Sequence, residues 1–219
     1  MKHPLSAVNR RKFLHQAALT TLGTGALGIL PKLDFAQSPP DPTINIIGPR
    51  EGYSPQIGIL VSQMDWVRAT VISATKGLTQ PELDFLVDAQ SNSIGALLMH
   101  LAATDAVYQD LTFYNLKDFS PANKKKFGVA MELGDEGRKQ IKGHDLNFYI
   151  NTMTEVREST LKEFKNRDDK WFQEVDPDFF GGPTNNFCKW FHVCEHEANH
   201  RGQMTVIRKR LPGNHSKAE

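Results

Sequence analysis

Cysteine is scarce in this sequence, and its placement excludes a disulfide within the chain. Only two cysteines occur among the 219 residues, Cys188 and Cys194. On one helix, six residues apart, their Cα atoms would be about 9 Å apart and their side chains would point in different directions. A disulfide needs a shorter Cα separation. We therefore expect two free thiols that are buried as small apolar side chains, with a functional thiol as the alternative.

A charge excess of either sign is also lacking, which argues against a nucleic-acid partner. Lysine plus arginine number 26 and aspartate plus glutamate number 25. Nucleic-acid binders normally carry a strong basic surplus. The longest basic run, Lys124-Lys125-Lys126, is expected on a solvated surface. We predict no nucleic-acid partner.

The sequence also lacks long apolar runs, so we expect no segment that is long and apolar enough to span a membrane. The longest weakly apolar stretch, Ala17 to Leu30, is short and contains three glycines. No cysteine follows it, so a lipoprotein anchor is not supported. It comes after Asn9-Arg10-Arg11-Lys12-Phe13-Leu14, which resembles the twin-arginine export motif. We expect residues 1–36 to be a twin-arginine signal peptide that sends the protein to the periplasm or outside the cell, with a frayed N-terminal helix as the alternative.

No segment shows a convincing strand pattern, and four segments show the pattern of an amphipathic helix. Apolar residues recur at spacings of three and four, as on one face of a helix. The predicted helices cover about residues 54–76, 91–113, 142–166 and 184–211. Residues 115–141 are expected as a long crossover with at most one small helix, and residues 167–183 as a loop. This pattern predicts an all-α fold, a four-helix bundle.

Prolines and the predicted helices divide the rest of the chain. Residues 37–53 contain four prolines and are expected as an extended linker. Residues 54–211 form the predicted helical domain. Pro212 and Gly213 stop the last helix, so residues 212–219 are expected as a tail.

Three histidines form a candidate metal site. His196 and His200 are four residues apart, so they lie on one face of the last helix and can hold one cation together. His100 lies in the middle of another predicted helix, beside its apolar face. Alone it could be a core histidine with a satisfied hydrogen bond, and the pair could be at the surface. Together the three predict a metal site with an open position for water or substrate.

The segment His196-Glu197-Ala198-Asn199-His200 also matches the metalloprotease pattern H-E-x-x-H. Such a protease usually takes its third ligand from downstream. Only 19 residues follow His200 here, and their one acid is Glu219. We therefore predict that the protein is not a protease of this type.

The residues beside the pair have less defined roles. His192, one turn before His196, is expected to line the site as an indirect metal partner or a proton shuttle and not as a ligand. Glu195 and Glu197 point away from His196 on either side, and solvent exposure is the commoner fate of a helical glutamate.

The chain resembles the DinB-like superfamily, which includes thiol-dependent transferases for bacillithiol and mycothiol. The resemblance rests on three segments: Ser93 to Leu101, Met153 to Leu161, and His192-Val193-Cys194-Glu195-His196-Glu197-Ala198-Asn199-His200-Arg201-Gly202-Gln203. It implies an up-down-down-up bundle with a long crossover between the second and third helices. It also implies a divalent metal, zinc or nickel, held by His100, His196 and His200.

In such members the metal activates a low-molecular-weight thiol for attack on an electrophile. The chain departs from them by its export motif, because thiol cofactors are cytoplasmic, and a metal-dependent hydrolase that activates water therefore competes with an S-transferase. The alternative from another class is a non-catalytic metal-binding or stress-response bundle. A homodimer is possible, and the sequence leaves open the substrate, the reaction and the physiological metal.

Overall fold

The structure is a computed structural model that describes residues 42–213. The expected twin-arginine signal peptide and residues 214–219 of the expected tail lie outside the described part. Within it, no helix is long and apolar enough to cross a membrane.

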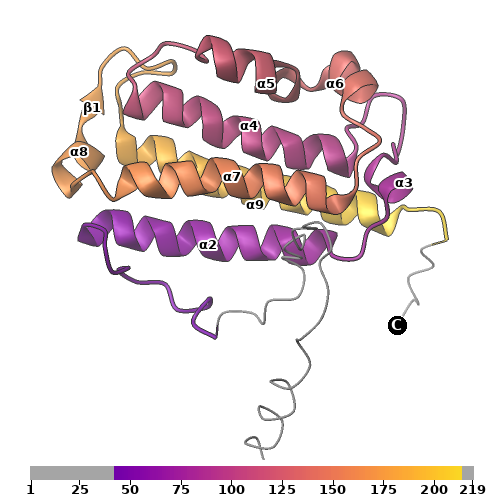
Figure 1. The fold of residues 1–219 in the computed structure, drawn as a ribbon, viewed down its shortest axis with the longest axis horizontal. Helices are drawn as coiled ribbons and strands as arrows, with labels where there is room; N and C mark the ends of the chain where they lie inside the picture. Colours follow the sequence, from indigo (N-terminus) through magenta and orange to yellow (C-terminus); the bar gives the residue numbers. More distant parts are fainter. Residues whose placement is uncertain (1–41, 214–219) are drawn as a thin grey trace, which may run out of the picture. The chain divides into compact units, whose positions relative to one another are not determined.

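Four long helices dominate the described residues, as predicted (Figure 1). They are α2 (Pro55–Thr75), α4 (Ile94–Phe113), α7 (Leu146–Phe164) and α9 (Asn186–Lys209). The shorter elements are α3 (Gln80–Leu83), α5 (Pro121–Glu132), α6 (Gly134–Gln140), α8 (Asp169–Gln173) and the strands β1 (Val175–Asp176) and β2 (Thr184–Asn185). The fold is therefore all-α, apart from one two-residue antiparallel ladder.

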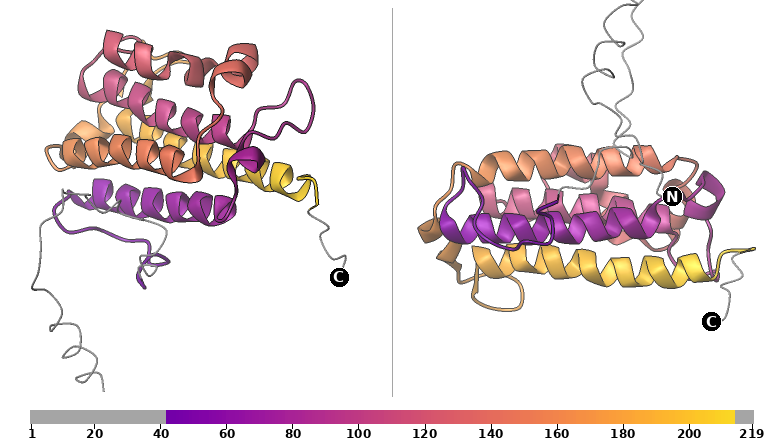
Figure 2. Two further views of the ribbon diagram at one scale, coloured as in Figure 1. Left: turned by 45° about the vertical axis from the view of Figure 1, so that its right-hand side comes forward. Right: turned by 90° about the horizontal axis from the view of Figure 1, so that it is seen from below.

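The long helices are arranged up-down-down-up. The rings of Phe113 and Phe164 lie 5.5 Å apart at the ends of α4 and α7, so these two helices run in the same direction. Trp190, near the start of α9, lies 4.9 Å from Phe164, so α9 runs the opposite way. Arg208 Nη1 donates to Ala74 O over 2.7 Å near the ends of α9 and α2, so these two are parallel. Figure 2 shows α2 and α9 side by side from below.

Side-chain caps set where the helices begin. Ser93, Asp145 and Asn185 each accept a hydrogen bond from the backbone N–H three residues later, at the starts of α4, α7 and α9. The third helix was expected from residue 142 but begins at 146. Gly143 has a positive φ of 82°, which ends any helical path before the Asp145 cap.

One glycine permits close packing between α4 and α7. A Cβ atom at Gly95 would lie 2.7 Å from Tyr149 Oη, which is closer than a real Cβ atom comes to such an atom in folded proteins. The missing side chain lets the Tyr149 ring lie fully buried against the start of α4. This contact holds the two parallel helices together at the end opposite to Phe113.

The crossover and the loop contain more structure than the sequence suggested. Residues 115–141 hold two helices, α5 and α6, in place of at most one. Phe127, 2% exposed, belongs to the apolar core shared with α4 and fixes α5 there. Its helix was hard to predict because Lys124, Lys125 and Lys126 precede it, and these three lysines are exposed as expected. Residues 167–183, expected as a loop, hold α8 and β1.

Candidate metal centre

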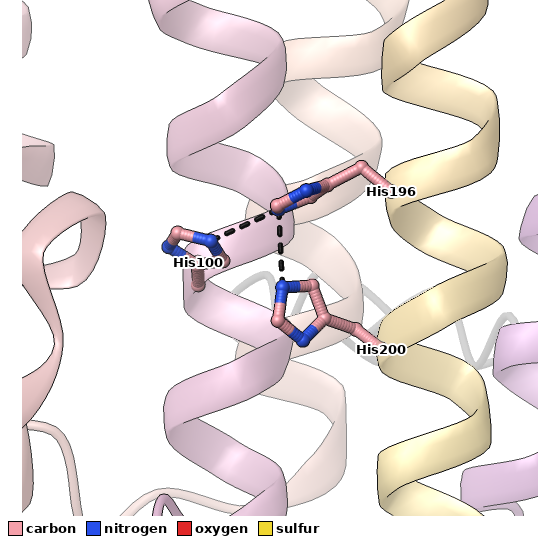
Figure 3. A group of neighbouring side chains, drawn as sticks. All are labelled: His100, His196 and His200. Carbon is pink, nitrogen blue, oxygen red and sulfur yellow. Dashed lines mark hydrogen bonds between the residues drawn. The ribbon is translucent and has the colours of Figure 1, made fainter.

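Three histidine side chains converge between α4 and α9 (Figure 3). His196 Nε2 lies 2.9 Å from His100 Nε2 and 3.1 Å from His200 Nε2. His100 and His200 are each 8% exposed, and His196 is half-buried. The fold thus brings together the three residues that the sequence placed in the candidate metal site.

The outer ring nitrogens of two histidines are held by fixed oxygen acceptors. His100 Nδ1 lies 2.8 Å from Ala130 O on α5, and His200 Nδ1 lies 3.0 Å from Gln203 Oε1. Carbonyl and amide oxygens only accept hydrogen bonds, so each Nδ1 carries the proton. The Nε2 atoms of His100 and His200 then present lone pairs to the centre of the cluster.

The donor set fits a divalent cation. Only His196 can place an N–H between the other two rings, and one proton can satisfy only one of its two contacts. The other Nε2 lone pair is then left without a donor, and a cation at the centre would accept it. Three nitrogen ligands around tetrahedral zinc would be about 3.4 Å apart, close to the separations seen.

All three imidazoles are neutral at physiological pH, as metal ligands must be. Burial lowers the pKa of His100 and of His200. Burial, and then the neighbouring imidazoles, lower the pKa of His196 to about 3. Protonation therefore does not compete with a metal at neutral pH.

His192 lies beside this cluster and outside the ligand set. Its ring centroid is 5.3 Å from that of His196, and its Nδ1 is 2.8 Å from Glu195 Oε1. The side chains of His192 and Glu195 are about half exposed, at 46% and 52%. Their partly exposed position beside the histidine cluster is compatible with the role expected for His192, which was to line the metal site or to shuttle protons. This role stays a prediction.

A buried group of four charged residues was missed in the sequence. We call it the charge quartet, and it consists of Arg68, Asp105, Arg157 and Glu197, one from each long helix. Glu197 Oε1 accepts hydrogen bonds from Arg68 Nη2 at 2.6 Å and from Arg157 Nη2 at 2.5 Å. Asp105 Oδ2 accepts from Arg157 Nε at 2.9 Å. Two positive and two negative charges cancel in the interior.

Glu197 was expected to face solvent, and this was wrong: it is 1% exposed. Burial opposes its ionisation, but Arg68 and Arg157 hold the pKa of Glu197 below its usual range. Since Glu197 lies between His196 and His200 in the sequence, its ion pairs fix the rotation of α9 that points both histidines at His100. The sequence did contain a sign of this buried group. In each long helix a charged residue stands at the spacing of the buried apolar residues, such as Arg68 four residues after Met64.

The two thiols are separate and free. Cys194 is buried, as expected, and burial raises its pKa to about 12. Cys188 was expected to be buried but is exposed. It lies near the start of α9.

Comparison with known proteins agrees with this geometry. The family described as mycothiol-S-transferase, a DinB-like family, matches residues 59–213. The chain belongs to this family. The matched segment includes α2 from residue 59, all of α4, α7 and α9, the three clustered histidines and the whole charge quartet.

A solved structure shows the same fold at low sequence identity. It is described as the conserved protein of locus from Enterococcus faecalis, with a TM-score of 0.57 and 12% identity. The alignment covers 71% of this chain and 96% of that one. No curated protein matches the chain.

Proposed function

We propose that the protein is a metal-dependent enzyme of the S-transferase type, with His100, His196 and His200 as the ligands of one divalent ion, zinc or nickel. The convergence of three Nε2 atoms, with His196 Nε2 within hydrogen-bonding distance of the other two, carries this proposal. Family membership supports a small thiol as the co-substrate.

Hydrogen bonds within the protein orient the imidazole rings for metal binding. Ala130 O and Gln203 Oε1 hold two rings in the tautomer that directs Nε2 inward. When bound, the metal would lower the pKa of a coordinated thiol and so supply a thiolate at neutral pH. Three protein ligands leave a position for such a substrate.

His192 is proposed to receive the thiol proton at the rim. Its Nδ1 is engaged by Glu195 Oε1, so its Nε2 is left to accept a proton from an incoming group. Imidazole exchanges protons readily near neutral pH. The half-exposed pair then passes the proton to solvent.

A second candidate is a metal-dependent hydrolase that activates water at the same ligands. The twin-arginine-like segment, Asn9 to Leu14, favours it, because export would separate the protein from cytoplasmic thiols. We propose export because this segment resembles the twin-arginine motif. A signal-peptide fusion to a reporter that folds before transport tests it, with Arg10 and Arg11 replaced by lysine in the control.

The test of the transferase proposal is thiol consumption by the metal-loaded protein in the presence of a reactive electrophile. We expect acceleration by the wild type, loss in His196→Ala, and retention in His144→Ala, a matched change at an exposed histidine outside the cluster. Wild-type protein that binds one metal but accelerates neither thiol transfer nor ester hydrolysis would contradict the enzyme proposal. It would favour a non-catalytic metal-binding bundle.

A further inference from the structure

A cavity is lined by residues of α8, of β1 and of the chain around them. Figure 1 shows α8 and β1 at one end of the bundle. The cavity has a volume of about 440 Å³, within the range of small-molecule sites. Its walls come from the end of α4, the turn after α7, β1 and the start of α9. Thr112 in its wall is twelve residues beyond His100 on α4, which is about 18 Å along the helix.

Basic side chains outnumber acidic ones in the lining of the cavity. Three basic side chains line it, Lys117, Arg167 and Lys189, against two acidic ones, Glu174 and Asp176. Glu163, outside the lining, contacts Arg167 at 3.4 Å and offsets the remaining charge. This modest balance suits a small carboxylate, which needs few donors, better than a phosphate monoester, which carries about −1.5 to −2 at neutral pH.

Arg167 is positioned like an anion-binding arginine. Its guanidinium carbon lies over the Phe113 and Trp171 rings, 5.6 Å from each ring centroid. Its Nη2 makes only a long 3.4 Å contact with Glu163, and its buried Nε–H has no hydrogen-bond partner among the described residues. A planar guanidinium with free donors matches a carboxylate. The Nε–H is itself shielded from solvent, so a carboxylate in the cavity would bind the outer Nη donors.

Lys189 adds a second, deeply placed charge. Its side chain is 3% exposed, and its Nζ donates to Asp176 Oδ2 over 2.9 Å and lies 4.5 Å from the Phe179 ring. The hydrogen bond from Lys189 lowers the pKa of Asp176, so this carboxylate balances the ammonium. An ammonium has three donors, and only the one to Asp176 is engaged by a described side chain.

We propose that this cavity is a binding site for a small aromatic or aliphatic carboxylate, with Arg167 as its principal contact and the Phe113–Trp171 face as the apolar wall. The site is independent of the metal centre and of the transferase proposal. A carboxylate there would bridge α4, α8 and α9 and stabilise this end of the bundle.

The test uses benzoate as the probe and benzamide as its neutral counterpart, with binding measured by calorimetric titration of the full mature chain. We expect saturable benzoate binding, little or no benzamide binding, and a loss of at least about tenfold in affinity in Arg167→Met. Lys117→Gln, at an exposed position where folding is not at risk, should weaken binding severalfold. Lys170→Gln, an exposed lysine on α8 outside the cavity, should not change it.

Two further variants locate the site. Benzoate should change the tryptophan fluorescence of the wild type but not of Trp171→Phe, and His196→Ala should bind benzoate as the wild type does. No saturable binding, equal binding of benzamide, or loss of benzoate binding in His196→Ala would each overturn the proposal. None of these outcomes bears on whether the histidines hold a metal.

Discussion

Replacing Glu197 by glutamine should destabilise the protein severely, although it keeps the size of the side chain. Glu197 accepts hydrogen bonds from Arg68 and Arg157, and its Oε2 also accepts from Arg68 Nε at 3.2 Å. A glutamine offers two N–H donors to guanidinium groups that can only donate. The charge quartet would keep two arginines and a single carboxylate, and one uncompensated positive charge would remain in the interior.

The expected magnitude follows from the burial of the network. Removing one partner from a buried ion pair costs about 3–5 kcal/mol. For a chain of this size, each kcal/mol lowers the melting temperature by about 2–4 °C. We therefore expect Glu197→Gln to melt roughly 6–20 °C below the wild type.

Urea unfolding of the metal-free protein, followed by far-ultraviolet circular dichroism, measures this loss without a contribution from metal binding. Glu195→Gln is the matched control, since its side chain is 52% exposed two residues away, and it should change stability by less than about 0.5 kcal/mol. A loss below about 1 kcal/mol in Glu197→Gln would refute the buried-charge argument.

A second replacement tests whether charge balance is the cause. Adding Arg68→Gln to Glu197→Gln restores neutrality and leaves the pair between Arg157 and Asp105 intact. The loss in free energy of unfolding in the double variant should be smaller, by at least about 1 kcal/mol, than the sum of the losses in the two single variants. Additive losses would instead point to packing.

Three other perturbations have defined outcomes. The pKa of His196 is about 3 in the folded protein, and its ordinary value is 6.5. Between these two pH values the unfolded chain therefore binds a proton at His196 that the folded protein does not bind. The stability of the metal-free protein should thus fall as the pH drops from about 6.5 toward 3, and equal slopes for His196→Gln and the wild type in urea titrations would contradict this. Gly95→Ala should cost about 1–3 kcal/mol in the same assay, because its methyl group meets Tyr149 Oη; unchanged stability would show that the ring moves freely. Exposed Cys188 should react quickly with a thiol reagent in the folded protein and buried Cys194 only in urea, and two rapid reactions would contradict the burial of Cys194.

The bundle was predictable because its signals are local. Apolar spacing gave the four long helices, and caps such as Ser93 and Asn185 marked where they begin. The short helices of the crossover were harder, because α5 buries only Phe127 and Ala130 and exposes a run of lysines. Their stability comes from packing on α4, which the spacing within a short segment does not reveal.

The candidate site was partly predictable for the same reason. His196 and His200 share a face by spacing alone, and His100 could be added because it lies beside the apolar face of another long helix. The positions of Ala130 and Gln203 as partners of the outer ring nitrogens could not be foreseen, because one depends on how α5 packs and the other on a side-chain rotamer. Glu197 was misjudged because a lone charge on a helix is usually solvated, and only the fold shows that two arginines from other helices meet it.

The metal content of the purified protein tests the central claim most directly. It should be measured by mass spectrometry on protein prepared without chelators or nickel affinity resin, beside His100→Ala and the control His144→Ala. We predict about one equivalent of zinc or nickel in the wild type and in His144→Ala, and a small fraction of that in folded His100→Ala. A full equivalent retained by His100→Ala, or no metal in the wild type even after incubation with zinc and nickel salts, would contradict the cross-helix metal centre.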